Sequence, residues 1–176
     1  MGQILFKSNQ KPPYVVLMGL DGAGKTTLLS RLQWGKRMDT SPTVGFNVGT
    51  LELARGIALT VWDVGGQGEM RTNWKYYLDD CKALVFVVDG EDRSRLGEAQ
   101  KALKKVLKEE SIKKVPLMVL VNKKDVPNSM TIREVSTQLD LPSNKDRDWE
   151  IQACSAYTGL GLQQAFLSVA QLIKKQ

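Results

Sequence analysis

One segment of the chain has the residue types and spacing of a phosphate-binding loop. Residues 19–26 read Gly-Leu-Asp-Gly-Ala-Gly-Lys-Thr, which fits the pattern G-x-x-x-x-G-K-T. Its glycines let the backbone approach a phosphate closely, and the backbone N–H groups form a nest for an anion. A coincidental glycine turn is the alternative, but the loop lies between an apolar run and a helical pattern, as the motif requires.

The side chains of this loop are suited to binding a nucleoside triphosphate. The Lys25 ammonium is placed to neutralise charge on the β- and γ-phosphates during phosphoryl transfer, and the Thr26 hydroxyl is placed to bind Mg²⁺. The N-terminal end of the following helix adds a favourable field for an anion. We expect the nucleotide to contact the consecutive residues Asp21, Gly22, Ala23, Gly24, Lys25, Thr26 and Thr27.

A second motif indicates which base is bound. Asn122-Lys123-Lys124-Asp125 follows an apolar strand pattern at residues 117–121. The Asp125 carboxylate can accept hydrogen bonds from both N1 and N2 of guanine, whereas adenine offers no such pair of donors on that edge. Asn122 is expected to tie this segment to the phosphate loop, and the stem of Lys123 is expected to lie over the base. A polar turn with no ligand is the alternative.

A third motif, Trp62-Asp63-Val64-Gly65-Gly66-Gln67, combines residues suited to magnesium, phosphate and water. Asp63 is placed to hold Mg²⁺ through a water molecule, and Gly66 can offer its backbone N–H to the γ-phosphate. Gln67 is the candidate for orienting the attacking water, because its amide is too weakly basic to take the proton. A surface-loop role is the alternative for Gln67. Thr43, in the loop between the first predicted helix and the predicted hairpin, is expected to complete the magnesium shell and to sense the γ-phosphate.

These motifs lie at the ends of predicted strands that alternate with predicted helices. We expect strands over residues 14–20, 46–53, 57–62, 83–88, 117–121 and 149–154, with a hairpin turn at Arg55-Gly56. Helices are expected over residues 25–33, around 99–106, over 131–139 with Thr131 and Glu134 as a capping box, and at the C-terminal end. Such alternation is typical of a mostly parallel sheet with helices on both faces and ligands at the carboxyl ends of the strands. The length of 176 residues suits one domain.

Composition narrows the class of protein. The formal charge is +6, but the lysines are spread out and form no aromatic-interleaved patch, so we expect no nucleic-acid partner. Histidine is absent, which excludes an imidazole base. Cys81 and Cys154 have no partner at a metal-ligand spacing and are interpreted as filler with no chemical role. No membrane span or secretory signal is apparent, so we expect a cytoplasmic protein.

Together, these segments resemble the Arf and Arf-like small GTPases. The resemblance rests on the phosphate loop, on Pro-Thr-Val-Gly-Phe-Asn at residues 42–47, on Trp-Asp-Val-Gly-Gly-Gln at 62–67 and on Asn-Lys-Lys-Asp-Val-Pro-Asn-Ser-Met at 122–130. The segment at 62–67 is far more specific than a phosphate loop. The match runs from Tyr14 to the last predicted helix. It implies an α/β, single-domain P-loop GTPase fold with a mostly parallel six-stranded sheet and helices on both faces.

The resemblance also implies an activity and partners. It implies a monomer that binds GTP or GDP with Mg²⁺, hydrolyses GTP, and is cycled by an exchange factor and a GTPase-activating protein. In the GTP state it would recruit effector proteins, in membrane trafficking or signalling. Thr43 and Gln67 would lie in the two switch loops, and the backbone of Ser155 and Ala156 would meet the base. No arginine is evidently placed as an internal finger, so unaided hydrolysis is expected to be slow.

Residues 1–13 are interpreted as a membrane-associating or flexible segment, followed by the GTPase domain at 14–176. Gly2 is available for myristoylation, although Phe6 occupies the position where the general motif prefers Ser or Thr. A single myristoyl chain binds a membrane only marginally, so the apolar and basic residues between Ile4 and Lys11 would supply a second signal. We therefore expect reversible association with a membrane surface.

Two other functions stay open. A GTP-binding module that recruits effectors with negligible hydrolysis fits the same residues, because Gln67 alone does not set a rate. An ATP-using phosphotransferase would share the phosphate loop, but the motifs at 62–67 and 122–125 argue against it. Product analysis distinguishes the first alternative, and competition between GTP and ATP distinguishes the second.

Overall fold

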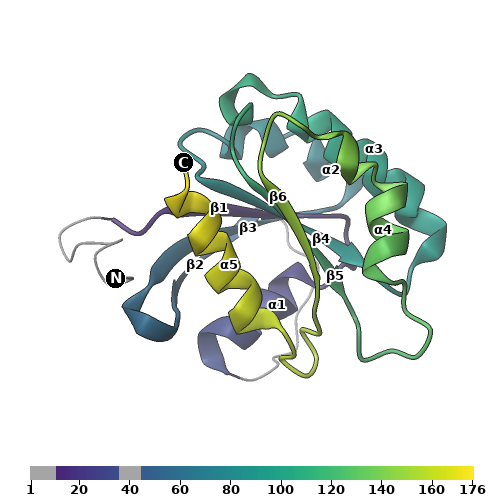
Figure 1. The fold of residues 1–176 in the computed structure, drawn as a ribbon, viewed down its shortest axis with the longest axis horizontal. Helices are drawn as coiled ribbons and strands as arrows, with labels where there is room; N and C mark the ends of the chain where they lie inside the picture. The colour runs from purple at the N-terminus through teal and green to yellow at the C-terminus, as the bar shows by residue number, and fades with distance from the viewer. Residues whose placement is uncertain (1–10, 36–44) are drawn as a thin grey trace.

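A six-stranded sheet runs through the middle of the molecule (Figure 1). The computed structural model describes residues 11–35 and 45–176. The strands lie in the order β2-β3-β1-β4-β5-β6, and every neighbouring pair is parallel except β2 with β3. Their bounds are β1 Tyr14–Met18, β2 Phe46–Glu52, β3 Ala58–Val64, β4 Ala83–Asp89, β5 Leu117–Asn122 and β6 Trp149–Ala153. The predicted mostly parallel sheet of six strands is confirmed.

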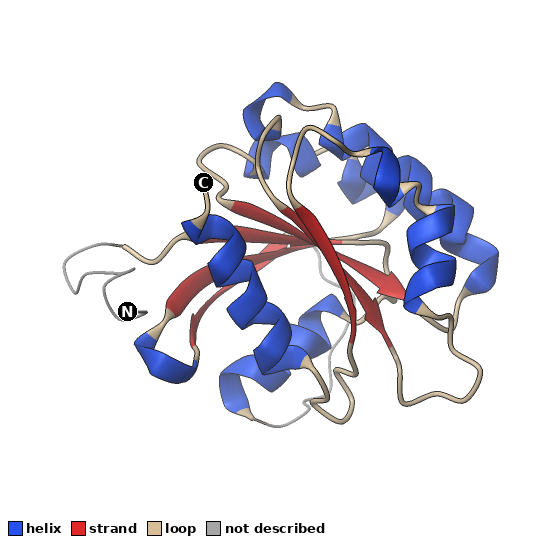
Figure 2. Cartoon of the chain, viewed as in Figure 1, coloured by secondary structure: helices blue, strands red, loops and turns tan. Residues whose placement is uncertain are grey.

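Helices cover both faces of this sheet (Figure 2). The helix bounds are α1 Lys25–Trp34, α2 Gly68–Arg71, α3 Leu96–Leu107, α4 Ile132–Gln138 and α5 Leu162–Lys174. Buried side chains of α1 and α5 form one core cluster with one face of the sheet, and those of α3 and α4 form a second cluster with the other face. This double cover explains the unbroken apolar runs of β4 and β5. Within residues 11–35 and 45–176, no helix is long and apolar enough to cross a membrane.

Short 3₁₀ turns connect several of these elements. They lie at Ala54–Gly56, Trp74–Tyr77, Arg93–Arg95, Glu110–Ile112 and Leu141–Ser143. The first contains the predicted hairpin turn, where Arg55 and Gly56 adopt left-handed φ values of 69° and 72°. At the start of α4, the Thr131 hydroxyl accepts a hydrogen bond of 3.0 Å from the Glu134 N–H, as predicted. The Glu134 carboxylate pairs with Arg93, so the described residues show only the Thr131 half of the capping box.

The two cysteines lie in the core. Cys81 and Cys154 are both buried and unpaired. Burial raises the pKa of the Cys81 thiol to about 11 and that of Cys154 to about 12. Both therefore stay protonated and unreactive at neutral pH, which fits the predicted filler role.

The parallel order of the strands brings several loops to one edge of the sheet. Because β1, β3, β4 and β5 run in the same direction, the loops that follow them all open at their carboxyl ends. These loops contain residues 19–24, 65–67, 90–92 and 123–131. In open α/β sheets, ligands bind outside this edge. The three chemical motifs of the sequence therefore meet at the expected position.

Candidate nucleotide-binding site

Lys25 lies at the centre of the phosphate loop. It is only 6% exposed, and its ammonium donates hydrogen bonds to the carbonyls of Gly19 at 3.0 Å and Leu20 at 3.1 Å. Burial lowers the pKa of Lys25 to about 8, against the opposing effects of Asp63 and Asp21. The loop thus holds a cation whose charge an incoming phosphate would stabilise.

Gly24 shapes the end of the phosphate loop. It has a left-handed φ of 95° and lies directly before α1. A Cβ atom at this position would lie 2.4 Å from Nδ2 of Asn122, so a side chain would displace that amide. The chain then enters α1 with Lys25, Thr26 and Thr27 in the first turn. The N–H groups in the first turn of an α-helix point toward its N-terminal end, which is the direction from which an anion binds.

Thr26 and Asp63 meet at the predicted magnesium position. The Thr26 hydroxyl donates a hydrogen bond of 2.5 Å to Oδ2 of the fully buried Asp63, and Nδ2 of Asn47 donates to the same oxygen at 3.2 Å. A carboxylate and a hydroxyl are the hard oxygen ligands that Mg²⁺ prefers. Within the described ranges, no three His, Cys, Asp or Glu side chains group to hold a metal, so phosphate oxygens and water would have to supply further ligands. Thr43 lies outside the residues that the structure describes.

The peptide units on either side of Gly66 are held against the phosphate loop. The indole N–H of the buried Trp74 donates to the Gly65 carbonyl at 2.9 Å, and the Asp21 N–H donates to the Gly66 carbonyl at 3.1 Å. A Cβ atom on Gly66 would lie 2.2 Å from the carbonyl oxygen of Gly19, so only glycine fits at this position. The close approach places Gly66 beside the loop predicted to hold the phosphates.

Gln67 follows Gly66 at the start of α2. It is half-buried, and its carbonyl accepts hydrogen bonds from the N–H groups of Met70 at 2.8 Å and Arg71 at 3.2 Å. The short helix therefore fixes the backbone of Gln67 next to the phosphate loop. This is the position from which the predicted water-orienting side chain would have to act.

Asn122 joins the guanine motif to two other loops. Its side chain is 2% exposed, and its Nδ2 donates to the Ala23 carbonyl at 2.8 Å. Its Oδ1 accepts a hydrogen bond of 2.9 Å from the Ala156 N–H. The predicted tie between Asn122 and the phosphate loop is confirmed. The same amide also fixes the loop that follows β6, which the sequence did not indicate.

The acidic and basic residues of the guanine motif have specific partners. The Ser155 hydroxyl donates to Oδ1 of Asp125 at 2.6 Å, so the side chain of Ser155, and not only its backbone, belongs to this end of the site. The Lys123 ammonium donates to the Gly22 carbonyl at 3.0 Å and to Oδ2 of Asp89 at 2.7 Å. The Lys123 ammonium therefore bridges the guanine motif and the phosphate loop. That its stem lies over the base stays a prediction.

Comparison with known proteins identifies the family. The model of the Arf family (ADP-ribosylation factor family) matches residues 2–173. This chain belongs to the Arf family. A solved structure of the Arl6 (BBS3) small GTPase from Trypanosoma brucei, with the bound nucleotide analogue GppNp, matches with a TM-score of 0.86. The two sequences are 32% identical over 94% of this chain and 99% of that chain. The Arf-family chain thus has a small GTPase fold, of a family that binds guanine nucleotide.

Most predicted site residues of this Arf-family protein converge at one edge of the sheet. Those placed there by the contacts above are Asp21, Gly22, Ala23, Gly24, Lys25, Thr26, Thr27, Asp63, Gly66, Gln67, Asn122, Lys123, Asp125, Ser155 and Ala156. The predicted magnesium ligand Thr43 and the predicted lipidation site Gly2 lie outside the described residues. Asn47 and Asp89 were not predicted. Asn47 ends the segment at residues 42–47 but received no role from it, and Asp89 lies at the end of β4 outside any motif. Only the fold assigns each of them a partner.

Three charged side chains that pair with the predicted Asp21, or with its partners, were not predicted. We define the Asp21 cluster as Asp21, Arg71, Arg95 and Glu98. Arg95 donates to Oδ1 of Asp21 at 2.7 Å and to Oε2 of Glu98 at 2.9 Å, and Arg71 lies 3.4 Å and 3.2 Å from the same two oxygens. The hydrogen bond from Arg95 is the main cause that lowers the pKa of Asp21. Arg71 and Arg95 are 50 and 74 residues away from Asp21 in sequence, so no local pattern could reveal this contact.

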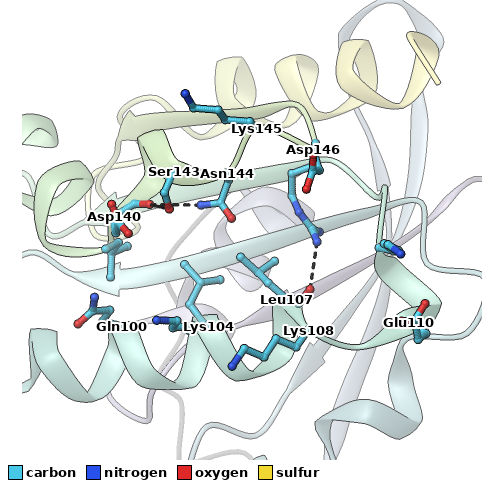
Figure 3. A pocket seen from close by; sticks show the side chains of 14 residues that line it. Gln100, Lys104, Leu107, Lys108, Glu110, Asp140, Ser143, Asn144, Lys145 and Asp146 are labelled. Atoms are coloured by element: carbon cyan, nitrogen blue, oxygen red, sulfur yellow. Dashed lines mark hydrogen bonds between the residues drawn. The ribbon is translucent and has the colours of Figure 1, made fainter.

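A separate cavity of about 370 Å³ lies between α3 and the loop from α4 to β6 (Figure 3). At its edge the Arg147 guanidinium donates to the carbonyls of Leu107, Ile112 and Val115 at 3.1, 3.0 and 3.1 Å. Burial lowers the pKa of Arg147. These bonds fix the C-terminal end of α3 to the β6 side of the sheet. None of the predicted site residues lines this cavity, so it belongs to the scaffold of this Arf-family protein and not to its nucleotide site.

An aromatic cluster lies on the β2–β3 side of the Arf-family chain. The rings of Phe46 and Trp62 stack at a centroid distance of 4.6 Å, and Tyr77 lies 5.6 Å from Phe46. Tyr14 packs against Trp62 at 5.4 Å, and its hydroxyl donates to the Tyr77 carbonyl. Phe46 is 45% exposed. Aromatic side chains exposed in this way are suited to protein contacts.

Proposed function

We propose that this protein is a switch that binds GTP and Mg²⁺ and hydrolyses GTP to GDP and phosphate. The observation that carries the proposal is the position of Asn122, whose amide bonds both the phosphate loop at Ala23 and the base-side loop at Ala156. This side chain makes one continuous site out of a loop suited to phosphate and a loop suited to guanine. The family membership supports the same conclusion.

Selectivity for guanine is assigned to Asp125. Its carboxylate would accept hydrogen bonds from N1 and N2 of the base, and the Ser155 hydroxyl already holds one of its oxygens at 2.6 Å. The backbone at Ser155 and Ala156 would meet the base from the other side. Adenine would cover this carboxylate without offering matching donors, which costs binding free energy.

Hydrolysis is assigned to positioning and electrostatic stabilisation. Lys25 would stay protonated against the β- and γ-phosphates, and the Gly66 N–H would donate to the γ-phosphate. Gln67 would orient the attacking water, whose proton is lost to solvent or phosphate because an amide cannot hold it. Mg²⁺, held by Thr26 and Thr43 directly and by Asp63 through water, would neutralise charge on the phosphate oxygens when bound.

Partners are proposed from the family and from the surface. The aromatic cluster contains the exposed Phe46 on β2 and the half-buried Trp62 on β3 and Tyr77. It begins directly after the predicted first switch loop, so an effector could bind there in the GTP state. An exchange factor and a GTPase-activating protein would set the rates of the cycle.

At the N-terminus we propose myristoylation of Gly2 and reversible membrane association. Intact mass of the protein from eukaryotic cells would test it, because an unmodified Gly2 would exclude this anchor.

Single-turnover hydrolysis of bound GTP tests the proposed activity. We expect slow conversion to GDP by the parent and a rate roughly 100-fold lower for Gln67→Leu, because the attacking water loses its orienting amide. Equal rates for the two proteins would remove Gln67 from the mechanism. No conversion by the parent, even with cell extract as a source of activating protein, would leave a GTP-binding module without hydrolysis. Displacement of bound GDP by an equal concentration of ATP would contradict guanine selectivity.

A further inference from the structure

The Asp21 cluster joins the phosphate loop to the segment that carries Gln67. We propose that Arg71 is a positioning residue for GTP hydrolysis, because it bridges the Gly66 carbonyl and the Asp21 carboxylate and so fixes the peptide that leads into Gln67. The inference rests on the proposed function and adds to it a role for one residue. It concerns a residue that no motif of the sequence indicates.

The hydrogen bonds of Arg71 act on one specific peptide plane. Its Nε donates to the Gly66 carbonyl at 2.9 Å, while its Nη2 lies 3.4 Å from Oδ1 of Asp21. The Gly66 carbonyl and the Gln67 nitrogen belong to the same planar peptide unit. A donor that fixes this carbonyl therefore also fixes the start of Gln67. The second donor to the same oxygen is the Asp21 N–H at 3.1 Å. Both hydrogen bonds therefore tie the Gly66 carbonyl to the phosphate loop, one directly from Asp21 and one from Arg71, which contacts the Asp21 carboxylate.

The neighbouring peptide, between Gly65 and Gly66, is fixed by a different group. Its carbonyl accepts the indole N–H of Trp74 at 2.9 Å. Its N–H, on Gly66, forms no hydrogen bond with any residue that the structure describes and is the group proposed to meet the γ-phosphate. Trp74 therefore orients the proposed phosphate donor, whereas Arg71 orients the peptide before the water-orienting residue. Loss of Arg71 should affect hydrolysis more than GTP affinity.

Arg71 contributes by positioning the peptide between Gly66 and Gln67, and not by adding charge to the site. The Asp21 cluster contains two guanidinium groups and two carboxylates, so it adds no net charge beside the phosphates. The Arg71 side chain is 20% exposed, against 34% for Arg95, 42% for Asp21 and 47% for Glu98. It is the most shielded member, and hydrogen bonds from a guanidinium strengthen when water is excluded.

Arg95 provides a matched control within the same cluster. It also bonds Asp21 and Glu98, at 2.7 Å and 2.9 Å, and its Nη1 donates to the Asp21 carbonyl at 3.1 Å. Among the described residues it has no hydrogen bond to Gly66 or Gln67. Arg95→Ala thus removes two ion pairs, as Arg71→Ala does, but leaves the bond to the Gly66 carbonyl intact.

The test compares Arg71→Ala, Arg71→Lys and Arg95→Ala in the full chain, preloaded with GTP and Mg²⁺. We expect the single-turnover rate constant to fall roughly tenfold in Arg71→Ala, with the Kd for GTP and for GDP nearly unchanged. Arg71→Lys should stay equally slow, because a single ammonium cannot reproduce the planar fork between two acceptors. The rate constant should fall clearly less in Arg95→Ala than in Arg71→Ala.

Three results would overturn the inference. An equal fall of the hydrolysis rate constant in Arg71→Ala and Arg95→Ala would indicate a general structural role of the Asp21 cluster. Full activity in Arg71→Lys would indicate that charge alone suffices. A fall in GTP affinity as large as the fall in rate would show that Arg71 acts on binding. Failure of the proposed function is distinguishable, since it would appear as absent hydrolysis or absent guanine binding in the parent itself.

Discussion

The two ends of the nucleotide site are held by different kinds of interaction. At the guanine end, the neutral amide of the buried Asn122 joins the loops through Ala23 and Ala156, and the exposed Asp125 carboxylate is the charged group proposed to face the base. At the phosphate end, a buried lysine and the Asp21 cluster carry most of the polar contacts. Neutral hydrogen bonds respond little to salt and pH, whereas ionisable groups respond to both. The comparison indicates a guanine end that is built before the ligand arrives and a phosphate end that responds to the ligand and the medium.

Deletion of the carboxylate at the guanine end should have the largest effect. Asp125→Ala should raise the Kd for GDP roughly 1,000-fold, because two hydrogen bonds to a charged acceptor are lost at about 1.5–3 kcal/mol each. Fluorescence titration with labelled GDP measures the change. Asp148→Ala, which removes an exposed aspartate before β6, is the matched control and should leave the Kd near the parental value. If the loss of GDP affinity in Asp125→Ala disappeared at high salt, a short-range role for Asp125 would be contradicted.

The phosphate end should show a pH dependence that the guanine end lacks. In the free protein burial lowers the pKa of Lys25 to about 8, and bound phosphate would raise it again. Binding then takes up a proton above pH 8, so nucleotide affinity should fall as pH rises, by roughly tenfold between pH 7 and pH 9. Titration of labelled GDP across this range measures the slope.

Lys25→Arg is the control for the pH effect. An arginine stays charged throughout this range, so the variant should bind more weakly but with little dependence on pH. The same slope in Lys25→Arg and in the parent would assign the titration to another group. A slope that steepens in Asp125→Ala would contradict the separation of the two ends.

Removal of the hydroxyl that holds Asp125 should have the smallest effect. Ser155→Ala takes away the hydrogen bond of 2.6 Å to Oδ1 of Asp125, and the Kd for GDP should rise about fivefold, as expected for about 1 kcal/mol. Faster dissociation of labelled GDP should account for the change. Ser143→Ala is the control, because its hydroxyl bonds only the Asp140 carbonyl among the described residues. An unchanged dissociation rate in Ser155→Ala would mean that Asp125 is positioned by its backbone alone.

Elements with a strong local pattern could be predicted from the sequence with small errors in their ends. The strand predicted at residues 117–121 is β5, Leu117–Asn122, and the helix predicted at 25–33 is α1, Lys25–Trp34. The strand predicted at 14–20 ends earlier, at Met18, because the chain turns into the phosphate loop there. The role of Thr131 as an N-cap was also predictable, since it depends on a contact three residues away. Its partner Glu134, however, pairs with the distant Arg93.

The sequence by itself determined the chemistry at each strand end, because a motif such as Gly19 to Thr26 is a run of adjacent residues whose geometry is local. Only the tertiary structure decided which of these groups touch. Asn122 lies 99 residues from Ala23 and Arg95 lies 74 residues from Asp21, and both contacts exist because β1, β4 and β5 pair in parallel and α3 packs on their face. Contacts across such separations depend on packing and register, which no local pattern of residues records.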